Sequence, residues 1–123
     1  MTKAIIQFSD DSPVIYLHGD GFVLNEDEDK PSKLLIQLMY FVRTFIKVRG
    51  YYDAEYMTAR CIQYLANVRD NDILTDGVIK VTGIGVYNSD TDIDTNYRII
   101  ITPTKLWATD RDNLVIRNTG LGI

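Results

Sequence analysis

A chain of 123 residues, 46% of them hydrophobic and 24% charged, is long enough for one hydrophobic core and is expected to fold as a single domain, residues 1–123. Its single cysteine excludes an internal disulfide and a cysteine-based zinc site. The net charge of −4 argues against a nucleic-acid-binding protein, because binding a phosphate backbone requires a concentrated positive surface.

The chain begins with a predicted strand hairpin and a polar loop. The first residues, MTKAIIQF, contain no apolar run long enough for a signal peptide, which favours a cytoplasmic location. Residues 3–8 and 14–17 predict two strands, because the residues between them are turn formers. The acidic run from Asn25 to Pro31 is expected to be a solvated loop.

The segment SKLLIQLMYFVRTFIKVR, from Ser32 to Arg49, predicts the central helix of the domain. It contains good helix formers and no Gly or Pro, and Ser32 and Gly50 are suitable residues for its two ends. A helix that is apolar over most of its circumference is normally covered on more than one side. We therefore expect part of its apolar surface to meet a second subunit. Its three basic residues and Gln37 argue against a membrane span.

A second helix is expected from Asp53, as N-cap, to about Asp70. Tyr56 and Arg60 lie at helical spacing on its polar face. The residues of its packing face are Met57, Cys61, Tyr64, Leu65 and Val68. Because only a short link joins the two helices, they should be antiparallel neighbours.

After a turn at residues 72–77, the spacing of apolar residues changes from helical to extended. Gly83 and Gly85 lie inside the first of the later strands and suggest a bulge or a close approach to the backbone. Residues 120–123 are expected to be a tail. Strands on both sides of a helical pair predict an α+β domain with two antiparallel helices packed on an antiparallel β-sheet. The predicted later strands are residues 78–87, 97–102, 105–108 and 114–118, the last two forming a hairpin.

His18 is the only histidine and lies close to Asp20 in a glycine-rich segment. Such a pair could act as a general acid or base near neutral pH. No serine, cysteine or second histidine at a motif spacing completes a nucleophilic site, and a polar residue at the end of a turn is the alternative interpretation.

The loop after the glycine strand superficially resembles a calcium loop, because aspartates recur at positions 90, 92 and 94. Thr95 and Ile101 stand where an EF-hand requires Gly and Glu. Gly83 and Gly85 lack the third glycine and the following helix of a dinucleotide-binding motif. The sequence therefore predicts neither a metal site nor a cofactor.

Arg60, one turn after Tyr56 in the second predicted helix, is the most informative charge. It could be a surface residue paired with Asp53 or Glu55, or an anion ligand beside an aromatic ring. Stacking of a base on an aromatic ring contributes about 1–3 kcal/mol, so a few such contacts suffice for a nucleotide. Arg60 and Tyr56 are therefore candidate ligand-binding residues. Further candidates for the same site are His18, Tyr87, Asn96, Trp107, Arg111 and Arg117.

Four segments, in order along the chain, resemble those of a family of small bacteriophage proteins. IYLHGDGF at 15–22 is similar to the signature Ile-Tyr-x-His-x-Asp-Gly-aromatic, and DAEYMTARCI at 53–62 is similar to the second-helix motif. GIGV at 83–86 and DIDTNYRI at 92–99 resemble its glycine strand and its Asp-Ile-acidic-x-x-Tyr-x-Ile segment.

The proteins of this type that are best understood are the Thoeris anti-defence proteins. They are encoded by phages and sequester cyclic ADP-ribose isomers, and some of these proteins also bind cyclic oligonucleotides. The resemblance implies a homo-oligomer, a dimer or an assembly of dimers, in the cytoplasm of the infected bacterium. It implies sequestration of a cyclic nucleotide without cleavage, no role as an enzyme, and no nucleic-acid or membrane partner. Arg60 would be a phosphate ligand. The chain departs from the pattern at Gly19, Val23 and an acidic insertion at 25–30.

Two other functions are compatible with the sequence. A protein inhibitor of a host defence enzyme could present residues 26–29 and the aspartates at 90, 92 and 94 as a mimic of nucleic acid. Such an inhibitor would form a stable complex with a host protein and would not bind small nucleotides. A phosphodiesterase could use His18 and Asp20, and it would turn its ligand over.

Overall fold

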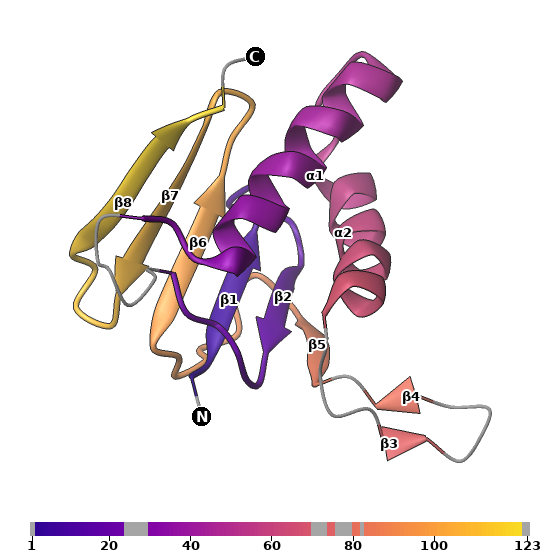
Figure 1. The fold of residues 1–123 in the computed structure, drawn as a ribbon. Coiled ribbons are helices and arrows are strands. Elements are labelled where there is room, and N and C mark those ends of the chain that lie inside the picture. Colours follow the sequence, from indigo (N-terminus) through magenta and orange to yellow (C-terminus); the bar gives the residue numbers. More distant parts are fainter. Residues whose placement is uncertain (1, 24–29, 70–73, 76–79, 82, 122–123) are drawn as a thin grey trace.

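The computed structural model of the chain describes residues 2–23, 30–69, 74–75, 80–81 and 83–121. Six strands form one sheet in the order β5-β2-β1-β6-β7-β8, and β3 and β4 form a separate pair. Two helices lie on one face of the larger sheet (Figure 1), which confirms the predicted α+β class. The elements are β1 (Ala4–Gln7), β2 (Val14–Leu17), α1 (Lys33–Arg49), α2 (Ala54–Val68), β3 (Leu74–Thr75), β4 (Lys80–Val81), β5 (Ile84–Tyr87), β6 (Tyr97–Ile101), β7 (Lys105–Asp110) and β8 (Val115–Gly120).

The large sheet is antiparallel except at its centre. The predicted hairpin of β1 and β2 is present, and β5, β7 and β8 also pair with antiparallel neighbours. β1 and β6 instead run parallel, with Ile6 opposite Ile99. A parallel pair requires a long crossover connection. Here the helices and the strands that follow them come between β1 and β6 in the sequence. This long connection lets the chain return beside β1 in the same direction.

The ends of α1 are set by the two residues predicted from the sequence. The Ser32 hydroxyl accepts a hydrogen bond from the Leu35 N–H at 3.2 Å. Gly50, at a φ of 85°, donates its N–H to the Ile46 carbonyl, a left-handed ending that favours glycine. In the described residues, no helix is long and apolar enough to cross a membrane. The buried side of α1 comprises Leu34, Leu35, Leu38, Phe41, Val42 and Phe45.

Helix α2 begins as predicted, because the Asp53 carboxylate accepts the Tyr56 N–H at 3.2 Å. It ends at Val68, two residues earlier than expected. Aromatic contacts fix its direction: Phe41 in α1 meets Tyr64, and Phe45, one turn later, meets Tyr56. The later residue of α1 meets the earlier residue of α2, so the predicted antiparallel pairing of the helices is confirmed.

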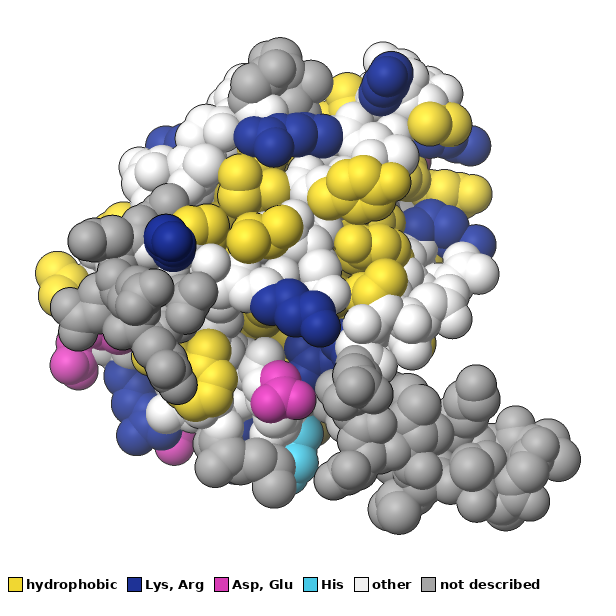
Figure 2. All heavy atoms as spheres, viewed as in Figure 1, with side chains coloured by type: hydrophobic (Ala, Val, Ile, Leu, Met, Phe, Trp, Pro, Cys, Tyr) yellow, Lys and Arg dark blue, Asp and Glu magenta, His cyan; other side chains and the backbone are white. Residues whose placement is uncertain are grey.

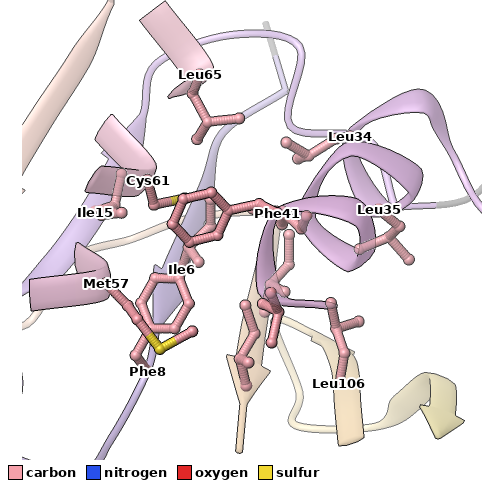
Figure 3. Close-up of a cluster of buried hydrophobic side chains, with 14 of the residues drawn as sticks. Ile6, Phe8, Ile15, Leu34, Leu35, Phe41, Met57, Cys61, Leu65 and Leu106 are labelled. Carbon is pink, nitrogen blue, oxygen red and sulfur yellow. The ribbon is translucent and has the colours of Figure 1, made fainter. Parts of the chain in front are cut away.

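The hydrophobic core lies between the helix pair and the sheet (Figure 3). Phe8, just after β1, packs edge-on against Phe41 of α1, with ring centroids 6.1 Å apart. Cys61 and Met57 of α2 are fully buried, as their predicted packing positions require. Burial raises the pKa of the Cys61 thiol, because a thiolate would lose its hydration there. The cysteine is therefore a small apolar core residue.

The long strand predicted over residues 78–87 is divided in the structure. β4 ends at Val81 and β5 begins at Ile84, and Gly83 between them has a φ of 73°. A left-handed residue does not continue an extended strand, so the chain turns there. The turn expected at residues 72–77 contains β3, which pairs with β4. The rest of that predicted turn, residues 72–73 and 76–77, lies outside the described residues, as do residues 25–29 of the predicted acidic loop.

The C-terminal hairpin is longer than the sequence predicts. β7 continues to Asp110, whose carboxylate accepts the N–H groups of Asp112 and Leu114 and so closes the turn. β8 continues to Gly120, and Leu121 is fully buried and donates its N–H to the Thr104 carbonyl at 2.9 Å. The prediction of a tail from residue 120 was therefore wrong for residues 120 and 121, because Leu121 packs into the core.

Candidate functional site

The exposed sides of α1 and α2 enclose a groove of about 320 Å³, here called the helix groove. Hydrophobic side chains gather over the two helices in Figure 2, with basic side chains among them. The groove is mainly aromatic, and its charged lining residues are both arginines. Its lining is Tyr40, Phe41, Thr44, Phe45, Val48, Arg49, Tyr56, Arg60 and Tyr64.

Two arginines from different helices converge on one tyrosine in this groove. The guanidinium carbon of Arg49 lies 4.7 Å from the centroid of the Tyr56 ring, and that of Arg60 lies 5.6 Å from it. Each exposed cation–π contact contributes about 0.5–1 kcal/mol, enough to favour these positions without consuming the hydrogen-bond donors. Tyr56 remains 42% exposed, and Arg49 and Arg60 are exposed as well, so the ring and both arginines are open to a ligand.

Arg60 has one described hydrogen-bond partner, Gln63, whose side-chain oxygen accepts from Nη1 at 2.9 Å. Within the described ranges, it forms no ion pair with Asp53 or Glu55, the pairing considered from the sequence. The described lining of the groove also contains no carboxylate. A guanidinium group has five N–H donors, so most of those on Arg60 are available for an anion.

Arg49 is a site residue that the sequence analysis did not identify. It donates a hydrogen bond to the Tyr51 hydroxyl, and this bond, with the nearby Tyr51 and Tyr56 hydroxyls and Asp53, raises its pKa. It therefore stays positively charged. A usable signal was present: in antiparallel helices joined by a short link, residues near the link face each other, so the last residue of α1 meets the first turn of α2.

The far end of the groove is formed by tilted aromatic rings. The Tyr64 ring lies 5.6 Å from that of Phe41 and 6.2 Å from that of Tyr40, at interplanar angles of 33° and 34°. Burial, with smaller effects from Tyr40 and Cys61, raises the pKa of the Tyr64 hydroxyl. The hydroxyl is thus protonated at neutral pH. The groove therefore offers apolar ring surface and hydroxyl groups at one end and guanidinium groups at the other.

The predicted residues His18 and Tyr87 lie on the opposite face of the sheet. Tyr16 stands between two core residues of β2 and so points away from the helices. Its ring lies 5.6 Å from that of Tyr87, and its hydroxyl lies 3.0 Å from Nδ1 of His18. A Cβ at Gly85 would lie 3.8 Å from both tyrosine rings, which is ordinary van der Waals contact, so the close approach inferred from this glycine does not require it.

Trp107 also faces away from the helices, because its neighbours in β7, Leu106 and Ala108, belong to the core. The Lys105 ammonium lies 4.8 Å from the Trp107 ring centroid. Trp107 is half-buried and separated from the helix groove by the thickness of the sheet and the helix layer. It therefore cannot contact a ligand in that groove within one chain.

Asn96 and Arg111 connect segments of the chain near the start of β6. The Asn96 side-chain oxygen accepts the Lys3 N–H at 2.9 Å. Arg111 Nε lies 3.6 Å from an Asp94 carboxylate oxygen, and Arg111 donates to the Thr95 carbonyl at 3.4 Å. Arg117, in β8, lies opposite Ala108 of β7 in the sheet. The side chain of Arg117 lies outside the described part of the structure.

Of the predicted ligand residues, Tyr56 and Arg60 line the helix groove, and the others with a described side chain do not. The physical reason is that a helix face and the outer face of a sheet are separated by the core. Among the described residues, no group of three or more His, Cys, Asp or Glu could hold a metal ion.

The chain is thus an α+β protein whose helix pair carries an aromatic groove with two converging arginines. Such a groove can hold a planar ring on its aromatic side chains and an anionic group on its guanidinium donors. Comparisons of the chain with protein-family models, with curated proteins and with solved structures find no match.

Proposed function

We propose that this protein binds and sequesters a cyclic nucleotide immune signal in the helix groove without cleaving it. In this proposal it is a phage immune-evasion protein that acts in the cytoplasm of the infected bacterium, as its resemblance to Thoeris anti-defence proteins implies. The observation that carries the proposal is the convergence of Arg49 and Arg60 on the exposed ring of Tyr56.

A nucleotide combines the two groups that the groove can hold. A base stacked on an aromatic ring contributes about 1–3 kcal/mol. A hydrogen bond to a charged group contributes about 1.5–3 kcal/mol. A dissociation constant of 1 µM corresponds to about 8 kcal/mol. One stacked base with phosphate contacts to Arg49 and Arg60 is therefore of the right order for a sequestering protein.

The position of His18 favours binding over hydrolysis. Cleavage of a phosphodiester requires a general base, a nucleophile or a metal ion at the phosphate. Among the residues that the structure describes, no histidine, cysteine or carboxylate lines the helix groove. His18 contacts Tyr16 on the other face of the sheet, so the phosphodiesterase hypothesis has no acid–base residue beside the arginines.

The exposed apolar side of α1 supports the proposed homo-oligomer. Ile36, Tyr40 and Val48 are 55%, 60% and 77% exposed, and their spacing of four or eight residues puts them in one stripe along the helix. In our proposal a second copy packs on this stripe and covers the groove. Arg111 could then reach a ligand only from the second copy.

Ligand capture tests the proposal directly. The purified protein is incubated with cyclic ADP-ribose isomers and with cyclic di- and trinucleotides, heated, and the released compounds are analysed by chromatography. We expect intact ligand to disappear from solution and to return after heating. Released ligand that is chemically altered would identify an enzyme. Ligands left untouched throughout the panel would contradict sequestration and favour a protein target.

Variants assign the binding to the groove. Arg60→Ala and Arg49→Ala should each lose capture while keeping their folded state and oligomeric mass. Lys47→Ala is the matched control, because Lys47 is an exposed cation in the last turn of α1 and does not line the groove. Capture that survives in Arg60→Ala would remove the groove from the proposal.

A further inference from the structure

A second cavity lies at the opposite end of the helix pair from the helix groove. It has a volume of about 260 Å³ and forms where α1 begins and α2 ends. None of its lining residues is shared with the helix groove. The lining is Asp20, Phe22, Ser32, Lys33, Leu34, Gln37 and Arg69.

Arg69 provides a positively charged hydrogen-bond donor in this cavity. It follows α2, and its guanidinium group donates a hydrogen bond to the Gly19 carbonyl. Its Nε is buried and has no hydrogen-bond partner within the described residues. Burial lowers the pKa of Arg69, and the nearby Asp20 opposes this effect. Arg69 also lines the cavity, and a charged guanidinium group with N–H donors favours an anion there.

The turn that forms one wall of the cavity is held firmly against the sheet. Gly21 lies so close to β1 that a Cβ there would be 2.7 Å from that of Ala4, and its N–H bonds to the Thr2 carbonyl at 3.0 Å. Asp20 has a φ of 55°, in the left-handed region. The segment HGDGF therefore holds Asp20 and Phe22 in a fixed arrangement. Both residues line this second cavity, and neither lines the helix groove.

We propose that this cavity binds a small organic phosphate. Among the described lining residues, Arg69 and Lys33 supply two positive charges for the phosphate, against one carboxylate, that of Asp20. Gln37 can add an amide donor, and Phe22, 55% exposed, provides a ring surface beside the cavity. Asp20 selects a ligand with a hydroxyl or amino group, since an ionised carboxylate only accepts hydrogen bonds. This site does not depend on the function proposed for the helix groove.

Calorimetric titration with inorganic phosphate, pyrophosphate and AMP tests the second site. We expect AMP affinity to fall at least tenfold in Arg69→Gln and in Lys33→Gln. Phe22→Ala should weaken AMP but leave inorganic phosphate unchanged. Lys47→Gln is the control that should keep AMP affinity within twofold of the unmodified protein, because Lys47 lines neither this cavity nor the helix groove.

Several outcomes would overturn this proposal. They are no binding of any of the three probes, unchanged affinity in Lys33→Gln, or AMP binding that is lost in Arg60→Ala and kept in Lys33→Gln. The last result would assign AMP to the helix groove. If Arg69→Gln does not fold, as judged by thermal unfolding, Lys33→Gln decides the question, because Lys33 is exposed at the first position of α1. Retained AMP binding in Arg60→Ala with lost capture of the cyclic nucleotide would separate the two sites.

Discussion

The helix groove and the outer face of the sheet both display exposed tyrosines, but their surroundings differ. In the groove, Tyr56 is flanked by two guanidinium groups. On the sheet, Tyr87 contacts Tyr16, which in turn contacts the imidazole of His18. An exposed tyrosine alone therefore does not mark a nucleotide site. The charge placed beside it by the local fold decides which of the two surfaces suits an anion.

The largest expected difference between the two regions is in stability. Phe41→Ala should lower the free energy of unfolding by about 3–5 kcal/mol, because Phe41 is buried and packs on Phe8 as well as in the groove. Tyr87→Ala should cost about 1 kcal/mol or less, since Tyr87 is 41% exposed on an edge strand. Urea unfolding of both variants measures this. Equal losses would show that the outer face is packed as firmly as the core.

The next effect is on ligand affinity. Tyr56→Ala should weaken binding of the captured cyclic nucleotide by about tenfold or more, because the stacking surface and the support for both arginines are lost. Tyr56→Phe should keep most of the affinity, since the ring remains. Tyr87→Ala is the matched control on the sheet and should change affinity less than twofold. Equilibrium titration would contradict the assignment if Tyr87→Ala were the more damaging variant.

A smaller effect is expected from pH. Burial raises the pKa of Tyr52, whose hydroxyl donates to the Phe8 carbonyl at 2.6 Å, and that of Cys61. Because the folded state disfavours their ionised forms, their contribution is complete below the ordinary pKa of each group, near 9 for the thiol and 10 for tyrosine, and declines above it.

Unfolding free energies measured from pH 7 to 10.5 should therefore be level at first and fall above about pH 9, by at most about 1.4 kcal/mol per pH unit for each group. Tyr52→Phe should be less stable at pH 7, because it loses the hydrogen bond that the hydroxyl donates to the Phe8 carbonyl, with the Ile101 carbonyl as a second nearby acceptor. Its profile should be flatter above pH 10. Stability that rises above pH 9 would contradict the burial of both groups.

Much of the fold could be predicted because its determinants are local. Ser32, Gly50 and Asp53 mark helix ends through contacts within a few residues, so the sequence contains the whole signal. The parallel pairing of β1 with β6 could not be predicted in this way, because it joins segments about ninety residues apart and depends on how the helices pack. The same holds for Leu121, which is buried only through the folded hairpin.

The candidate site was only partly predictable. Tyr56 and Arg60 lie one helical turn apart, so periodicity alone brings them together. Arg49 joins them through contact between two helices, which residue type does not indicate and only the position of Arg49 beside the short link between the helices does. His18 and Trp107 were grouped with Arg60 by residue type, whereas strand alternation directs both away from the helices.

Chemical-shift mapping by NMR tests the central claim, that the nucleotide binds in the helix groove. The protein, labelled with ¹⁵N and ¹³C, is titrated with the nucleotide it captures, and shifts are followed at the side chains of Arg49, Tyr56 and Arg60 and of Tyr16 and Tyr87. If the nucleotide binds in the helix groove, saturable shifts are expected at both arginine Nε–H groups and at the Tyr56 ring, with little change at Tyr16 and Tyr87. Shifts confined to Tyr16 and Tyr87 would contradict it and move the site to the outer face of the sheet.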